Sequence, residues 1–507
     1  MSTTESLSIR EKSIYGAGQI CENIKNYAFG FFILFYYSQL LGLSASLTGL
    51  AIFIGMLADA ITDPLVGSTS DRWRSKWGRR HPLMYASILP MGLTFYLVFA
   101  PPAGLGQVGL FIWLTFFTIA SRAAMTFFMV PYTAMSAELT DHYTERTSIS
   151  QYRYGIGVMG IFATYGLAFL VFFAGEKGQF DVNAYPWYGA TLVIIMMAAM
   201  YLSTRGTHHL IPRLHQTEHQ GPTGIAAILK ESVSVFENYS FRWFFIGVLI
   251  LFIMVGVDGA LFLYVGSYIW EFERSQFFYL TISAAFGMLA GSFFTRWLHE
   301  KFDKKPIVLG GISWWAFWQL LPILLWLAGL LPEAGSTALL SLLVFMRFIQ
   351  YVGTLQALVT TPSMMADVAD EHELNTGRRQ EGIFFGAQTF SAKATSGFGK
   401  MVAGFALDII AWPKGQNILP SDVPDDKILW LALTYGPIVC GFAVVAVWCA
   451  SKYNIDRSRH ASILAELKTR REVSAAEANL AGLQFAQSKN NADPAIKAPS
   501  AAPKPAE

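Results

Sequence analysis

Apolar residues gather in twelve long runs along the chain, separated by shorter polar stretches. A helix of about 20 apolar residues is long enough to cross the hydrocarbon core of a bilayer, so each run predicts a membrane-spanning helix. The predicted spans cover residues 14 to 40, 47 to 69, 82 to 100, 106 to 137, 148 to 174, 187 to 203, 242 to 268, 276 to 298, 306 to 330, 336 to 362, 382 to 411 and 428 to 450. The pattern predicts an all-α membrane protein with twelve transmembrane helices.

The composition agrees with this pattern. Of 507 residues, 53% are hydrophobic and 14% are charged, whereas about a quarter of a soluble protein is charged. The net charge of +2 gives no indication of nucleic-acid binding, and we expect none. The three cysteines lie in apolar segments without metal-binding spacing, so they are expected to be buried hydrophobic residues. The polar residues 1 to 12 lack the features of a signal peptide, so the first span is expected to direct insertion.

Basic residues are concentrated on one side of the predicted spans. The loop from 69 to 81 alone contains five of them: Arg72, Arg74, Lys76, Arg79 and Arg80. The opposite side has only four: Lys177, Arg274, Lys414 and Lys427. Because positive charge stays on the cytoplasmic side, both termini and the segment 204 to 241 are predicted to be cytoplasmic.

An internal repeat divides the chain into two halves. Gly67-Ser68, Arg72-Trp73 and Arg80 recur with the same spacing in the segment from 291 to 304, and residues 135 to 141 are echoed by residues 364 to 370. Duplication of a six-helix unit is a common origin of transporter folds. The predicted parts are a terminus at 1 to 13, a half at 14 to 203, a linker at 204 to 241, a half at 242 to 452, and a tail at 453 to 507 that is partly helical and then disordered.

Two carboxylates interrupt the second span. Asp59 and Asp63 are four residues apart, so they lie one turn apart on the same face of a helix. Pro64 has no N–H for the carbonyl of Ala60, which leaves a further oxygen nearby. Buried carboxylates are costly unless partnered, and this set suits Na⁺ or a shared proton. The alternative is that both aspartates pair with basic residues and only hold the bundle together. No cofactor other than this coupling ion, Na⁺ or H⁺, is expected.

Other polar residues in the spans are candidate substrate ligands. Gln19, Glu22, Asn23 and Asn26 form a stripe along one face of the first span, and Tyr27 follows it. We take Gln19, Asn23 and Tyr27 as candidates, with hydrogen bonding between helices as the alternative.

Isolated charges in a membrane are costly, so the intramembrane acids are expected to face intramembrane bases. Asp59, Asp63 and Glu22 are the acids, and the bases are Arg122, Arg153 and Lys393. A cation could loosen one such pair and free a base to bind substrate. Asp258 stands alone in the seventh span, and Arg347 in the tenth either contributes to function or ties two helices together.

The loop after the second span has two interpretations. Its residues could latch the cytoplasmic face in one state of a rocking bundle, through the set Gly67, Asp71, Arg72, Gly78, Arg79 and Arg80. Alternatively, the charges only determine topology. Repetition of the pattern in the second half favours the latch.

These motifs resemble a known family. The segment from Gly67 to Arg80 resembles the signature loop of the major facilitator superfamily. Asp59-Ala-Ile-Thr-Asp63-Pro and Lys-Trp-Gly at 76 to 78 resemble the glycoside-pentoside-hexuronide:cation symporters, which include melibiose permease. The resemblance covers about residues 10 to 450. It implies a cation site at Asp59, Asp63 and Thr126, a substrate contact at Arg153, and a central lysine at Lys393.

The departures from that family's pattern bear on the substrate. Asn23, Met129 and Thr133 stand where melibiose permease has two aspartates and a tryptophan, and Arg122 replaces a small residue. Loss of two carboxylates and gain of a guanidinium argue against a neutral galactoside and favour an anionic substrate such as a hexuronide. The sodium-dependent lysophosphatidylcholine transporters are similar in the paired aspartates and the lysine, so an amphiphile is the alternative.

The sequence therefore predicts a symporter of the bacterial inner membrane that carries a sugar-type solute with Na⁺ or H⁺, functional as a monomer. Its expected partners are the small-molecule substrate and membrane lipid. A solute sensor that does not transport is the alternative from another class. An enzyme is not expected, because no catalytic or phosphate-binding motif occurs. The histidines from His208 to His219 could bind a metal, but a solvated loop explains them more simply.

Overall fold

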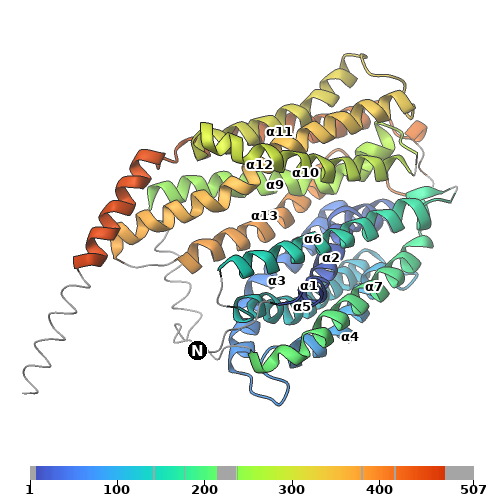
Figure 1. Cartoon of the computed structure of the whole chain (residues 1–507). Coiled ribbons are helices and arrows are strands. Elements are labelled where there is room, and N and C mark those ends of the chain that lie inside the picture. Colours follow the sequence, from blue (N-terminus) through green and yellow to red (C-terminus); the bar gives the residue numbers. More distant parts are fainter. Residues whose placement is uncertain are drawn as a thin grey trace, which may run out of the picture.

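The computed structural model describes residues 7–140, 143–175, 177–213, 236, 238–273, 275–377, 381–415, 418 and 420–473. Helices make up the first half in the order α1 (Ile9–Gly16), α2 (Gly18–Phe31), η1 (Phe35–Leu40), α3 (Ala45–Arg72), α4 (His81–Phe99), α5 (Gln107–Glu138), α6 (Tyr143–Leu167), η2 (Ala168–Phe172), η3 (Gly178–Phe180), α7 (Ala184–Gly206) and η4 (His208–Arg213). The second half contains α9 (Tyr239–Tyr268), α10 (Gln276–Lys301), α11 (Lys304–Leu327), α12 (Thr337–Thr376), α13 (Glu381–Ile409), η6 (Pro420–Asp422), α14 (Asp425–Leu433), η7 (Thr434–Ile438) and α15 (Val439–Ser451). Figure 1 shows the two groups of helices side by side.

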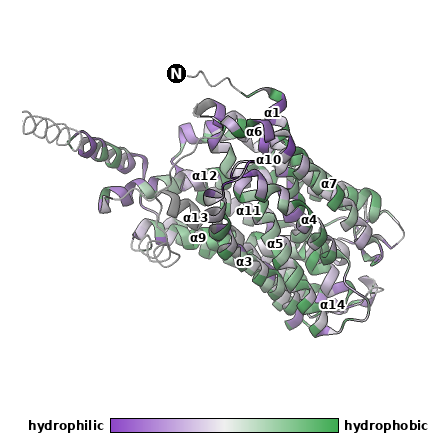
Figure 2. Ribbon diagram, turned by 90° about the horizontal axis from the view of Figure 1, so that it is seen from below, coloured by the Kyte–Doolittle hydropathy of each residue, from purple (hydrophilic) through white to green (hydrophobic). Residues whose placement is uncertain are grey.

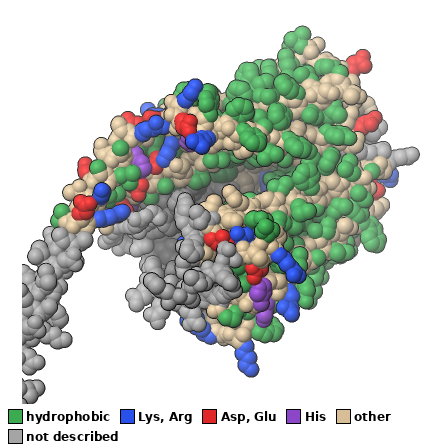
Figure 3. Space-filling view, viewed as in Figure 1, with side chains coloured by type: hydrophobic (Ala, Val, Ile, Leu, Met, Phe, Trp, Pro, Cys, Tyr) green, Lys and Arg blue, Asp and Glu red, His purple; other side chains and the backbone are tan. Residues whose placement is uncertain are grey.

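Within the described residues, ten helices are long and apolar enough to cross a membrane. The predicted spans 14 to 40 and 382 to 411 are not among those ten, although both segments are helical. The first is divided into α1, α2 and the π-helical turn η1, so no unbroken helix covers it. On the face seen in Figure 3 hydrophobic side chains cover most of the bundle, and charged ones gather at the end from which the tail emerges. Figure 2 shows that hydrophobic residues dominate the helices of the bundle. The prediction of an all-α membrane protein is confirmed.

One helix extends well beyond its predicted span. The tenth span was expected to end at residue 362, but α12 continues to Thr376. Acidic residues occupy this extension, and they have basic partners. Lys304 donates to both oxygens of Asp367 at 2.7 Å, and Arg459 lies 2.5 Å from Glu371. Because these partners neutralise its charge, the helix continues past the apolar stretch.

We call the end that carries residues 73 to 80 the basic end, and the end that carries residues 410 to 415 the opposite end. At the opposite end the two halves are joined by hydrogen bonds to Asp408 of α13. Its carboxylate accepts from the hydroxyl groups of Ser44 and Ser46 at 2.5 and 2.6 Å, and from the backbone N–H of Ser46 at 2.8 Å. Lys414 donates to the same carboxylate at 2.8 Å. Asp408 therefore caps the start of α3, a helix of the other half.

Aromatic rings and glycines complete the junction at this end. Three ring pairs cross it with centroids 5.1 to 5.3 Å apart: Phe31 with Phe262, Phe35 with Tyr264, and Phe169 with Phe277. A Cβ on Gly404 of α13 would collide with the carbonyl oxygen of Ala45 at the start of α3. Only glycine allows the two helices to approach this closely.

At the basic end, no hydrogen bond or salt bridge joins the halves among the residues that the structure describes. Figure 3 shows a hollow between the halves on the side of the tail. In the described part of the chain, the helical segment 457–473 forms its ion pairs with the second half: His460 lies 3.1 Å from Asp370, and Arg471 lies 2.8 Å from Glu373. The described junction between the halves therefore lies toward the opposite end.

Candidate functional site

The two aspartates of α3 face α5. A guanidinium nitrogen of Arg122 lies 2.8 Å from a carboxylate oxygen of Asp59, and both side chains are only 4% exposed. One turn further along both helices, the hydroxyl of Thr126 donates to Asp63 at 2.9 Å. The expected proximity of Asp59, Asp63, Arg122 and Thr126 is therefore seen in the structure.

The spacing of the sequence accounts for this arrangement. Residues four apart lie one above the other on a helix, about 6 Å apart along the axis. Asp59 and Asp63 on α3, and Arg122 and Thr126 on α5, have this spacing. Where α3 and α5 run side by side, the two residues of one helix can therefore meet the two residues of the other at successive turns. One is an ion pair and the other joins a hydroxyl to a carboxylate.

This arrangement places possible ligands for a cation beside an ion pair. The Asp63 carboxylate and the Thr126 hydroxyl offer oxygen ligands of the kind that a hard cation prefers. Asp59 offers a third oxygen group, but in this structure Arg122 contacts it. A cation and the guanidinium would therefore compete for the same carboxylate.

Three predicted substrate ligands of the first span make contacts within the first half. The Asn23 amide donates to the carbonyl of Gly157 on α6 at 2.8 Å. The Gln19 amide donates to Glu22 at 2.7 Å, and the Tyr27 ring packs edge-on against Tyr165 at 5.7 Å. In this structure these residues fit the alternative of contacts between and along helices, and their role with substrate stays a prediction.

The remaining predicted bases have different outcomes. Arg153 donates to the hydroxyl of Tyr154 at 2.9 Å, and its guanidinium lies 4.8 Å from the centre of that ring. No acid in the described part of the chain forms an ion pair with Arg153, so the predicted pairing of this residue is not seen. The side chain of Lys393 lies outside the described residues.

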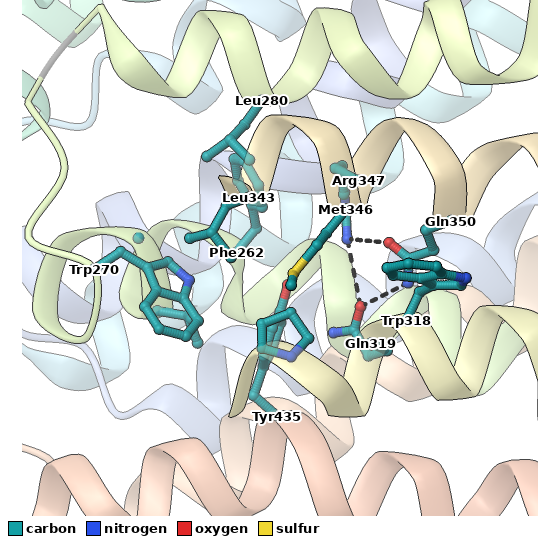
Figure 4. A pocket seen from close by; sticks show the side chains of 13 residues that line it. Phe262, Trp270, Leu280, Trp318, Gln319, Leu343, Met346, Arg347, Gln350 and Tyr435 are labelled. Atoms are coloured by element: carbon teal, nitrogen blue, oxygen red, sulfur yellow. Dashed lines mark hydrogen bonds between the residues drawn. The ribbon is translucent and has the colours of Figure 1, made fainter. Parts of the chain in front are cut away.

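Asp258 is not alone, because Arg347 lies 3.0 Å from its carboxylate. Tyr435 donates to the same carboxylate at 2.7 Å, and Gln319 donates at 3.1 Å. Figure 4 shows that Arg347 also donates to the side-chain oxygens of Gln319 and Gln350. The adjoining cavity measures about 50 Å³, which is room for one or two water molecules rather than a sugar. Arg347 therefore ties the helices of the second half together, as one of its two interpretations predicted.

The residues of the predicted latch contact one another within the first half. Glu138 lies 2.8 Å from Arg79 and 2.6 Å from Arg80, and Arg80 also lies 2.7 Å from Asp71. Gly78 has φ of +71°, a conformation that favours glycine. These pairs hold the loop against the end of α5. A Cβ on Gly67 would lie 3.7 Å from Val130, an ordinary packing distance, so no close approach requires a glycine there. The side chain of Arg72 lies outside the described residues.

The sequence repeat is also visible in these ion pairs. Lys304 and Asp367 occupy the positions that correspond to Arg80 and Glu138, and they form the same contact in the second half. Each half therefore fixes its own loop to the end of its fourth helix. A contact of these residues across the two halves stays a prediction.

Replacing Glu138 by glutamine should destabilise the first half. The buried carboxylate is shared by Arg79 and Arg80, and removing one member of a buried ion pair costs about 3 kcal/mol. The measurement is thermal unfolding of the detergent-purified protein. Glu300→Gln is the matched control, because its pair with Arg296 is exposed and is worth less than about 0.5 kcal/mol. Equal melting temperatures for the two variants would contradict the prediction.

Two buried lysines were missed by the sequence reasoning. Lys25 of α2 is 4% exposed, and Lys400 of α13 is 6% exposed. The available signal was their position, since each interrupts an apolar span, and Lys400 lies seven residues after Lys393 on the same helix face.

The helical bundle, together with the family match that follows, makes this protein a multi-pass membrane transporter of the major facilitator fold rather than an enzyme. The chain belongs to the family described as MFS/sugar transport protein, which matches residues 14–457.

Individual relatives and solved structures agree with this assignment. The chain is 25% identical to the putative glycoside/cation symporter YagG of Escherichia coli, over 82% of this chain and 86% of that protein. It is 24% identical to the sodium-dependent lysophosphatidylcholine symporter 1 of Gallus gallus, over 93% of this chain and 91% of that protein. A crystal structure of a mutant of the nucleoside transporter NupG has a TM-score of 0.61 at 13% identity, over 88% of this chain and 99% of that one. That likeness concerns the fold.

Proposed function

We propose that this protein carries a glycoside, pentoside or hexuronide across the membrane together with Na⁺ or H⁺, by alternating access. The observation that carries the proposal is the pair of successive contacts between α3 and α5. Asp59 pairs with Arg122 at 2.8 Å, and Asp63 accepts from Thr126 at 2.9 Å. Charged groups at such depth in a transporter are costly and commonly serve an ion pathway.

Coupling follows from competition for Asp59. A cation held by Asp63 and Thr126 would draw the Asp59 carboxylate toward itself and weaken the pair with Arg122. The released guanidinium has several donors for a sugar hydroxyl or carboxylate. Because linkage is reciprocal, the solute must raise cation affinity by the same factor. This reciprocity makes the two solutes move together.

We place both termini in the cytoplasm of a bacterial cell, with the protein working as a monomer in the inner membrane. The basic end then faces the cytoplasm, as the positive-inside rule requires. In that orientation the Asp408 junction lies on the outer side. The described contacts between the halves therefore correspond to a state closed to the outside.

The experiment is a calorimetric titration of the purified protein with neutral sugars, hexuronides and lysophospholipids, each with and without Na⁺ and at two pH values. We expect a sugar or hexuronide to bind more tightly when Na⁺ is present, by about tenfold, which corresponds to a coupling free energy of about 1.4 kcal/mol. Tighter binding at low pH without a Na⁺ effect would assign H⁺ as the coupling ion.

Two outcomes would overturn parts of the proposal. Binding of lysophospholipid alone would replace the sugar by an amphiphile, the solute named in one of the relatives. Sugar binding without counterflow in proteoliposomes would indicate a sensor, because a sensor binds its solute without moving it.

A further inference from the structure

Lys400 is a buried charge that the proposed cation site does not use. Its side chain belongs to α13 and the residue is 6% exposed. No acid in the described part of the chain forms a hydrogen bond or ion pair with its amine. Its Nζ lies against α2, 3.9 Å from the position that a Cβ on Gly30 would take. A buried ammonium group without a carboxylate partner is costly, and so calls for an explanation.

The charges around Lys400 have the same sign. Arg122 and Lys25 are the charged groups that act on its amine most strongly, and both are positive. The Asp59 carboxylate is already in contact with Arg122. Among the described residues, the charged groups that act on the Lys400 amine are therefore cations.

Arg122 and Thr118 of α5 add donors that lack acceptors. The Nε of Arg122 and the hydroxyl of Thr118 are buried, and neither makes a hydrogen bond in the described structure. Both side chains pack on Gly55 of α3: a Cβ there would lie 3.4 Å from Cδ of Arg122 and 2.5 Å from the methyl carbon of Thr118. A buried donor without an acceptor costs about 1 to 3 kcal/mol. Two such donors on one helix indicate an acceptor that the described residues do not supply.

We propose that Arg122, Lys400 and Thr118 form an anion subsite for a carboxylate or sulfonate group of the transported sugar. This inference rests on the proposed function, because it assigns one chemical group of the solute to named residues. An oxyanion has enough lone pairs to accept from the guanidinium Nε, the ammonium and the hydroxyl together. It would also offset the positive charges of Arg122 and Lys400.

Along α3, Lys400 packs between the paired aspartates and the opposite end of the molecule. The backbone of Lys400 packs on Gly49, which precedes Asp59 by ten residues, or about 15 Å along α3. Arg122 lies between these levels: its terminal nitrogen is 2.8 Å from Asp59, its Cδ packs on Gly55, and its Nε–H can donate to an anion. Anion binding at Nε would orient the guanidinium and so connect the solute with the cation site.

The experiment compares binding of methyl glucuronide and methyl glucoside, which differ at one carboxylate, in the presence of Na⁺. Lys400→Gln should weaken glucuronide binding by about tenfold to a hundredfold, since hydrogen bonds to charged groups are worth about 1.5 to 3 kcal/mol. Glucoside binding should not change. Lys400→Arg should retain glucuronide binding because it keeps the charge. Lys427→Gln, which removes a lysine that pairs with Asp426 on the surface, is the matched control.

A second variant guards against a general loss of folding. Thr118→Val keeps the shape of the side chain and removes only the hydroxyl, so it should weaken glucuronide binding several-fold and leave glucoside binding unchanged. If Lys400→Gln and Thr118→Val weaken both sugars equally, or neither sugar, the subsite is wrong.

Two further arms separate the possible failures. If chloride competes with neither sugar, the solute itself supplies the anion. A different result would be that glucoside binding requires chloride and that Lys400→Gln abolishes this requirement. The subsite would then hold an inorganic anion, and its assignment to the solute would be overturned. If the wild-type protein binds no sugar of the panel, the proposed function fails. If it binds the glucoside with Na⁺ and never prefers the glucuronide, only the anion subsite fails.

Discussion

Asp63→Asn should abolish uphill uptake of the solute while leaving exchange between internal and external solute. Asparagine keeps an oxygen that can accept from Thr126, whose hydroxyl donates to Asp63 at 2.9 Å. The variant removes the charge but not the shape, so the bundle should still fold and rock. Without the carboxylate the cation no longer binds, and accumulation should fall to equilibrium with the medium.

Asp59→Asn should lose uphill uptake as well, and it should also destabilise the protein. In the structure the buried guanidinium of Arg122 lies 2.8 Å from Asp59, and the variant leaves it without that carboxylate. Breaking one side of a buried ion pair costs about 3 to 5 kcal/mol. The double variant Asp59→Asn with Arg122→Met should recover the melting temperature but not the uptake. This separates stability from coupling.

The measurement is solute uptake into proteoliposomes under an imposed Na⁺ or H⁺ gradient, with counterflow in the same vesicles. Asp422→Asn, a change outside the predicted spans, is the control and should behave as the wild type. Undiminished uphill uptake in both aspartate variants would refute the assignment of the coupling site.

Asp408→Ala should open the opposite end of the molecule. The carboxylate accepts hydrogen bonds from the hydroxyl groups of Ser44 and Ser46 and from Lys414, and so joins α13 to the start of α3. Loss of an N-cap costs about 1 kcal/mol, and hydrogen bonds to a charged group are worth about 1.5 to 3 kcal/mol. The equilibrium between closed and open opposite ends should therefore shift by about a hundredfold toward the open state.

Spin labels at Val108 and Leu330 would report this change, because both residues are 71% exposed and belong to different halves. The distance distribution between the labels should gain a longer component in Asp408→Ala. Asp426→Ala is the matched control, since its carboxylate is exposed and pairs only with Lys427 at 3.6 Å in the described structure. An unchanged distribution in Asp408→Ala would show that the Asp408 contacts do not hold the end closed.

The cysteines do not interfere with labelling at the surface. Cys21, Cys440 and Cys449 are buried and free, as the apolar sequence around each of them predicted. If the spin label still reacts with them slowly, the three cysteines can be replaced by alanine in the protein used for labelling.

Several features followed from the sequence because they depend only on distance along one helix. Long apolar runs predicted the membrane class, since the thickness of the bilayer fixes the length of a spanning helix. The four-residue spacing of Asp59 and Asp63 placed both on one face of α3, and Thr126 was expected with them through the family resemblance. The repeat predicted matching loops, and the pairs of Arg80 with Glu138 and of Lys304 with Asp367 show the match.

The choice of partners depended on the tertiary structure. The sequence offered Arg122 and Arg153 as equivalent bases, but only Arg122 reaches an aspartate, while Arg153 contacts Tyr154. Asp258 and Arg347 are 89 residues apart and were not predicted to meet. Which residues meet depends on how each helix is rotated about its axis and how far it is shifted along its neighbour. Neither quantity is contained in the periodicity of one segment.

The sequence by itself determined the membrane class, the paired aspartates and the repeated loops, because each follows from spacing within one segment. Only the tertiary structure decided that Asp408 caps a helix of the other half and that Lys400 lies near Arg122. The physical reason is the close crossing of α3 and α13, where Gly49 and Gly404 allow backbones to touch. Such contacts join residues more than 300 positions apart, and no local pattern specifies them.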